Sequence, residues 1–235
     1  MRETLASAVA RALCLAAALA GGAAAQTTEP PASSDLWIAA ARGDLVAVRK
    51  LLGEGEEVNG LDRSGRTPLV IAARWGRSEV VEALLAAGAD AGLANGQGAS
   101  ALLVAVQWAP VGSVWKIVSD LLASGAPVDL ADRAGLTPVM ATVARGHAGA
   151  AEVLEQLLEA GADPDAADPA GVTPLYRAVS RGRADLVRPL LAAGADPTLP
   201  IGKEDDGRRT ALDLARSRSD EELLALLQES LATRD

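Results

Sequence analysis

The sequence predicts an all-α repeat solenoid, in which similar helical units stack one on another. Two segments carry the prediction, GRTPLVIAARWGRSEVVEALLAAGAD at residues 65–90 and GVTPLYRAVSRGRADLVRPLLAAGAD at residues 171–196. Pairs that begin a helix recur every 33 to 37 residues, at Thr67-Pro68, Ser100-Ala101, Thr137-Pro138, Thr173-Pro174 and Thr210-Ala211. Leu-Leu pairs and relatives of Gly-Ala-Asp keep the same phase, so three independent markers indicate one repeating unit.

The markers within a unit predict its helices in order. Threonine before proline supplies an N-cap, and the proline then stands in the first turn, where its missing N–H is not needed. Gly76 predicts the end of the first helix, because glycine readily adopts the positive φ of a helix C-cap. The second helix carries an apolar stripe at helical spacing, formed by Val80, Val81, Leu84 and Leu85. The Gly-Ala-Asp that follows predicts a turn into a hairpin loop.

The segment TPLVIAARWGRSEVVEALLAAGAD resembles the consensus of the ankyrin repeat, a β-turn and two helices over about 33 residues. The resemblance runs from about Asp35 to the last residue and implies about six units. Their approximate bounds are 35–63, 64–96, 97–133, 134–169, 170–206 and 207–235. One helix pair cannot bury its apolar face alone, which explains why the unit is repeated and why the last, more polar helix suits a cap.

Three segments depart from the repeat pattern by added residues, QWAPVGSVWK, ARGHAGAAEV and PIGKEDDGR. Insertions in solenoids collect on loops, either by drift or because they form a binding face. Trp108 and Trp115 favour a binding role for the first insertion. Pro189 predicts that the second helix of its unit starts late or is kinked. The third unit lacks the Thr-Pro pair and has three nearby glycines, so we expect its interface to be the weakest.

Residues 1–25 have the pattern of a cleaved secretory signal peptide. Arg2 and Arg11 form a basic start, an uncharged alanine-rich run follows, and small residues precede Gln26. The uncharged run is shorter than the roughly 20 residues of a transmembrane helix. We expect cleavage after Ala25 and a periplasmic or secreted protein without stable membrane insertion. The alternatives are an ordinary alanine-rich helix and an uncleaved anchor. The predicted bounds are signal peptide 1–25, linker 26–34 and repeat domain 35–235.

The composition argues against several classes of function. A formal net charge of −9 disfavours nucleic acid and anionic membrane surfaces as partners. Cys14, the only cysteine, lies in the predicted signal peptide, and His147 is the only histidine. His147 follows Gly146, where the resemblance implies a structural Gly-His pair rather than a catalytic base. The chain also lacks a phosphate-binding loop, a dinucleotide fingerprint and a calcium-loop spacing. We therefore expect no catalytic residue, no cofactor and no metal.

The resemblance also implies a binding surface, because residues just before the glycine of the first helix face a concave groove in the family. The corresponding groove residues are Arg42, Arg74, Trp75, Gln107, Trp108, Arg145, Arg177 and Arg181. The loop tips supply Asp62, Arg63, Asn95, Asp132, Arg133, Asp168, Glu204 and Asp205. Tryptophan and arginine are frequent interface hot spots, and arginine pairs bidentately with carboxylates. The sequence therefore predicts a non-catalytic protein that binds a partner protein with an acidic surface.

Alternatives stay open for the residues and for the partner. The arginines can be solvated cations favoured by the helix dipole, and loop aspartates usually serve turn geometry. Trp37 stands at an internal consensus position, and we expect it in the core. The partner can be an envelope enzyme, a toxin neutralised by an immunity protein, or a host protein bound by a secreted effector. A small ligand or peptide bound near Trp75 and Trp108 is the competing hypothesis.

Overall fold

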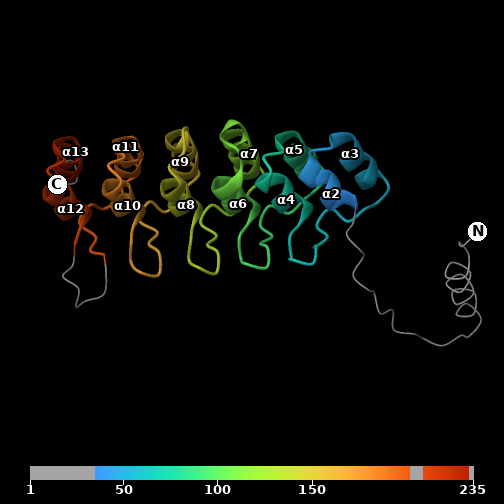
Figure 1. Cartoon of the computed structure of the whole chain (residues 1–235), viewed down its shortest axis with the longest axis horizontal. Helices are drawn as coiled ribbons and strands as arrows, with labels where there is room; N and C mark the ends of the chain where they lie inside the picture. Colours follow the sequence, from blue (N-terminus) through green and yellow to red (C-terminus); the bar gives the residue numbers. More distant parts are fainter. Residues whose placement is uncertain (1–34, 202–208, 233–235) are drawn as a thin grey trace, which may run out of the picture. The chain divides into compact units, whose positions relative to one another are not determined.

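The computed structural model describes residues 35–201 and 209–232, within which it contains twelve helices and no strand (Figure 1). The predicted signal peptide and linker lie outside the described residues, as do Glu204 and Asp205. The helices are α2 (Asp35–Arg42), α3 (Leu45–Gly53), α4 (Pro68–Arg74), α5 (Ser78–Ala86), α6 (Ala101–Trp108), α7 (Val111–Ala123), α8 (Pro138–Arg145), α9 (Ala150–Glu159), α10 (Pro174–Ser180), α11 (Ala184–Ala192), α12 (Ala211–Arg218) and α13 (Glu221–Ala232).

The helices are arranged as consecutive pairs, α2 with α3 and so on to α12 with α13. We call the even-numbered members the first helices and the odd-numbered members the second helices. Each first helix packs against the next first helix, and each second helix against the next second helix. Figure 1 shows the two kinds of helix in two layers, with the hairpin loops projecting beyond the first helices. The predicted all-α repeat solenoid is confirmed.

The predicted N-caps are present at the first helices. In four of them a hydroxyl oxygen accepts a hydrogen bond, 3.2 to 3.3 Å long, from the main-chain N–H three residues further on. The capping residues are Thr67, Ser100, Thr137 and Thr173, and all four are buried. Thr210 forms a reciprocal capping box with Asp213 at the start of α12. The repeated Thr or Ser is therefore the N-cap at which the first helix begins, as the sequence predicts.

The core is formed mainly by the first helices. Six consecutive residues are buried in each of α4, α6 and α8, whereas α12 buries only Ala211 and Ala215. The first helix of the third unit is thus as buried as those on either side of it, although the sequence predicts the weakest interface there. Trp37 lies in the core, as expected, and its Nε1 donates a 3.0 Å hydrogen bond to the carbonyl oxygen of Gly60.

The first insertion is helical rather than a loop. α7 has 13 residues where α5 has 9, and the added turn stands at its N-terminal end. Pro110 precedes this turn with an extended ψ of 145°, so it ends the connection from α6 and starts the new helix. The longer helix exposes the side chains of Val111 and Trp115.

Pro189 does not delay its helix. α11 begins at Ala184 and is nine residues long, as α5 is, with Pro189 inside it. The predicted late start is therefore wrong. Packing of the buried Leu186, Val187 and Leu190 holds the helix in the repeat register, although the proline removes one N–H donor. In the described part of the chain, no helix is long and apolar enough to cross a membrane.

Candidate functional site

One position of the repeat changes its residue type along the chain. It stands immediately before the turn that joins the two helices of each pair, and we call it the pre-turn position. Its occupants in chain order are Arg42, Trp75, Trp108, Arg145, Arg181 and Arg218. The two tryptophans and the last three arginines have different surroundings, which separate the candidate binding residues from residues that hold the stack together.

Arg145 is bonded to the preceding unit. Its Nη1 donates a 2.8 Å hydrogen bond to the carbonyl oxygen of Val106, and its Nη2 donates one of 2.6 Å to that of Ala109. The carbonyl of Val106 lies in the last turn of α6, and Pro110, four residues on, has no N–H to offer it. Arg145 supplies the missing donor. Burial lowers the pKa of Arg145 from its ordinary value, but a guanidinium stays protonated at physiological pH.

The same relation recurs in the next two units. Arg181 donates to the carbonyl oxygens of Val143 and Ala144 at the end of α8, and Arg218 donates a 2.5 Å hydrogen bond to the carbonyl oxygen of Ser180 at the end of α10. We call Arg145, Arg181 and Arg218 the arginine caps. Each closes the C-terminal end of the preceding first helix, where carbonyl groups lack intrahelical partners.

Two further arginines, located in the turns, donate hydrogen bonds to the preceding unit. Arg77 Nε donates a 3.0 Å hydrogen bond to the carbonyl oxygen of Ala41, and Arg183 Nη1 donates one of 2.6 Å to that of Gly146. Sequence reasoning did not single out these two residues or Arg218. The signal was present in their spacing, because each of them lies 36 to 38 residues after the carbonyl it reaches.

The two tryptophans at the pre-turn position face solvent. Trp75 is 53% exposed and Trp108 is 57% exposed. The guanidinium carbon of Arg74 lies over the Trp108 ring, 4.9 Å from its centroid, which is within cation–π distance. Trp108 Nε1 also donates a 3.0 Å hydrogen bond to Gln107 Oε1. We call the set formed by Arg42, Arg74, Trp75, Gln107 and Trp108 the tryptophan surface.

The layer of first helices differs in charge from the chain as a whole. No carboxylate side chain occurs in α4, α6, α8 or α10, although the formal net charge of the chain is −9. Among residues 35–201 and 209–232, no carboxylate is paired with Arg42 or Arg74. The tryptophan surface therefore carries exposed positive charge next to exposed aromatic rings.

Four of the predicted loop residues fold the loops themselves. In each, Oδ1 accepts hydrogen bonds of 2.8 to 3.1 Å from the main-chain N–H groups two and four residues on. These residues are Asp62, Asn95, Asp132 and Asp168. The exposed loop side chains among the predicted contacts are Arg63 and Arg133.

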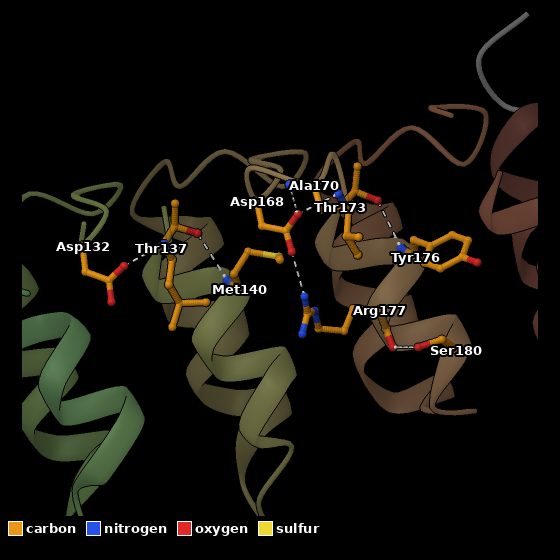
Figure 2. A network of polar contacts seen from close by, with 11 residues as sticks. Asp132, Thr137, Met140, Asp168, Ala170, Thr173, Tyr176, Arg177 and Ser180 are labelled. Atoms are coloured by element: carbon orange, nitrogen blue, oxygen red, sulfur yellow. Dashed lines mark hydrogen bonds and ion pairs between the residues drawn. The ribbon is translucent and has the colours of Figure 1, made fainter. Parts of the chain in front are cut away.

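Two of these turn aspartates are also paired with arginine. Figure 2 shows Asp168 between the N–H of Ala170 and the guanidinium of Arg177, whose Nη2 donates a 2.9 Å hydrogen bond to Asp168 Oδ2. Arg177, a predicted groove residue, is thus bonded to the loop that precedes its own helix. Burial alone would raise the pKa of Asp62, but hydrogen bonds from Arg66 and Ser64 lower that pKa below its ordinary value.

His147 lies against its own turn, with Nδ1 2.6 Å from the carbonyl oxygen of Ala148 and Nε2 buried without a hydrogen-bond partner. Within the described ranges, no three His, Cys, Asp or Glu side chains are grouped to hold a metal ion.

The exposed large apolar side chains of the described ranges all lie between residues 38 and 115, in the N-terminal half of the stack. The candidate site is therefore the tryptophan surface.

Comparison with known proteins agrees with this architecture. A family model described as ankyrin repeats (3 copies) matches residues 36–117, 102–201 and 148–233. Among solved structures, the crystal structure of an ankyrin repeat domain from Acinetobacter baumannii AYE is similar, with a TM-score of 0.73 and 28% sequence identity. That alignment covers 83% of this chain and 97% of the other. No curated protein matches the sequence.

Proposed function

Since the chain belongs to the ankyrin-repeat family, we propose that it is a non-catalytic scaffold that binds a partner protein on its tryptophan surface. Ankyrin repeats generally mediate contacts between proteins. The observation that supports this particular surface is the exposure of Trp75 and Trp108 on successive units. Tryptophan is enriched at the centre of protein interfaces, where its burial contributes much of the binding free energy.

The arginine caps restrict the part of the first-helix layer that is available to a partner. Arg145 and Arg181 donate to main-chain carbonyls of the preceding unit, so their side chains already have partners. Arg42 and Arg74 are exposed at the ends of α2 and α4. Arg74 precedes Trp75 in the sequence, and Arg42 holds the pre-turn position of the unit before it. We therefore place the partner over the first three units, where exposed rings and cations occur together.

The proposed location is the periplasm or the cell exterior. The proposal rests on the basic start, the uncharged alanine-rich run and the small residues before Gln26. N-terminal sequencing of the protein recovered from its native host tests it. A chain that begins at Gln26 in the secreted or periplasmic fraction supports cleavage, and an intact Met1 in the cytoplasmic fraction contradicts it.

A cross-linking capture with matched variants tests the binding function. The bait is the purified protein, presented to an envelope extract of the cell that produces it, beside a Trp75→Ala/Trp108→Ala variant. The control variant Val46→Ala/Leu61→Ala removes two side chains that are 80% and 56% exposed elsewhere on the N-terminal half. A protein captured by the wild type and the control but lost by the tryptophan variant supports the proposal. Equal capture by all three places the partner on another face.

A further inference from the structure

We propose that the partner chain on the tryptophan surface is an acidic segment, in which carboxylates alternate with apolar or aromatic side chains. The inference rests on the proposed function and specifies the chemistry of the partner. Its basis is the distribution of free and bonded cations along the stack, together with the contact between Arg74 and Trp108.

Among the arginines of the first helices, those without a bonded partner in the described ranges lie beside the tryptophans. Arg145, Arg177 and Arg181 donate to groups of this protein. In contrast, Arg42 and Arg74 have no paired carboxylate among residues 35–201 and 209–232. The first helices thus present bonded arginines over the C-terminal units and unpaired arginines over the N-terminal units.

The contact with Trp108 restrains the side chain of Arg74 in a way that favours binding of a carboxylate. The Arg74 guanidinium carbon lies over the Trp108 ring at cation–π distance. The N–H donors point outward in the plane of a guanidinium and match the two oxygens of a carboxylate. Because the ring already restrains the side chain, less conformational entropy is lost when a partner carboxylate binds.

The spacing of the units suits an extended segment. Arg42, Trp75 and Trp108 hold the pre-turn position in three successive units. Neighbouring packed helices lie about 8–10 Å apart, so this row spans roughly 20 Å, the reach of about six extended residues. A segment crossing the row would meet Arg42 first, then Trp75 beside Arg74, and then Trp108.

The surroundings of the row favour negative over positive partners. The helices α4 and α6 contain no carboxylate. Arg42 and Arg77 line a shallow pocket between the first two pairs, and Glu79 of α5 lines the same pocket. The lining of this pocket thus contains two cations and one carboxylate, and the exposed Arg74 at the end of α4 adds a third cation. A basic segment would meet net repulsion here, whereas an acidic segment would exchange water for charge-assisted hydrogen bonds.

A peptide-display selection tests the partner chemistry. Random peptides of about 12 residues, roughly twice the estimated span, are first depleted on the Trp75→Ala/Trp108→Ala variant and then selected on the wild-type protein. We expect enriched peptides with an excess of Asp and Glu around Leu, Ile, Phe, Tyr or Trp. Enriched peptides that are neutral or basic would overturn the acidic assignment and leave the proposed function standing. No enrichment beyond the depleted library would contradict both.

Charge-reversed variants provide the second readout. The affinity of the most enriched peptide is measured by fluorescence anisotropy for the wild type, Arg74→Glu and the control Arg49→Glu, which reverses an exposed charge on α3. We expect the Kd to rise at least about tenfold for Arg74→Glu and less than about twofold for the control, with affinity falling as salt increases. An unchanged Kd for a folded Arg74→Glu variant would overturn the inference, whatever the capture experiment shows.

Discussion

The guanidinium carbon of Arg74 lies over the indole ring of Trp108, 4.9 Å from its centroid. The contact joins the ends of α4 and α6, so it orders two side chains that are otherwise exposed on successive units. An exposed ring of this kind has one of two roles: it contacts a partner, or it supports the fold. The stability of tryptophan variants separates these two roles.

Substitution of exposed and buried tryptophans should have different costs. Trp75→Ala/Trp108→Ala removes two half-exposed rings, and we expect the free energy of unfolding to fall by less than about 1 kcal/mol. Trp37 is 8% exposed and hydrogen bonded, so Trp37→Ala should cost about 3–5 kcal/mol. Urea unfolding followed by circular dichroism measures both. A comparable loss in the double variant would mean that the exposed rings support the fold.

The arginine caps should act on stability rather than on a partner. Arg145→Ala leaves the carbonyls of Val106 and Ala109 without their donor, and we expect a loss of about 1–3 kcal/mol. Arg42→Ala removes an exposed side chain at the same position of the repeat and should change stability by less than about 0.5 kcal/mol. Thermal and urea unfolding of both variants provide the comparison. Equal stability of the two would remove the capping role.

The turn aspartates should tolerate asparagine but not alanine. Asn95 holds this position in one loop, and its Oδ1 makes the same two main-chain hydrogen bonds as Asp132 in the next. We therefore expect Asp132→Asn to be nearly neutral and Asp132→Ala to cost about 1–2 kcal/mol through the two unpaired N–H groups. Differential scanning calorimetry of the pair tests this. A large cost for asparagine would show that the charge, rather than the oxygen, holds the turn.

The pH dependence of Asp62 has a definite sign. Hydrogen bonds hold the pKa of Asp62 below its ordinary value in the folded state, so the unfolded state binds the proton more readily. Its contribution is therefore present in full above about pH 5 and is lost as the pH falls below about 4, through the folded-state pKa. The difference in unfolding free energy between wild type and Asp62→Asn should follow this course in urea titrations. A difference that grows on acidification would contradict it.

Hydrogen exchange should begin at the C-terminal pair of helices. α12 buries two alanines, whereas α6 buries six consecutive residues, so amides of α12 should open before those of α6. Exchange followed by mass spectrometry on pepsin fragments resolves the two helices. Fastest exchange in α6 would instead support the weak third interface that its missing Thr-Pro pair predicts.

Pro189→Ala should stabilise the protein. Pro189 lies inside α11, where alanine could donate to the carbonyl oxygen four residues earlier, on Asp185. We expect a gain of about 1–3 kcal/mol, because proline is about 3 kcal/mol less favourable than alanine inside a helix. Urea unfolding measures it. A loss of stability would show that the pyrrolidine ring, which lines the same surface pocket as Leu158, contributes more through packing than it costs in the helix.

The features predictable from the sequence are those encoded locally. The hydroxyl of Thr67 and the N–H it accepts from lie three residues apart, so the pattern alone indicates the cap. The acceptors of Arg145 lie 36 and 39 residues away, and its neighbours in sequence resemble those of a solvated arginine. Its role becomes visible only when successive units are placed side by side. The helical insertion at the start of α7 was predictable in principle, because proline is a common helix-start signal and Pro110 precedes this turn.

Every arginine cap reaches towards earlier residues. The donors follow their acceptors by 36 to 39 residues. The C-terminal end of such a first helix is therefore capped only after the next unit has been made. As the chain is synthesised from its N-terminus, each newly emerged unit can lock the one before it, and the stack consolidates in the direction of translation. A truncation therefore does more than delete its own residues. It also leaves the last remaining first helix frayed, and a nascent chain paused between units would present that open end to proteases.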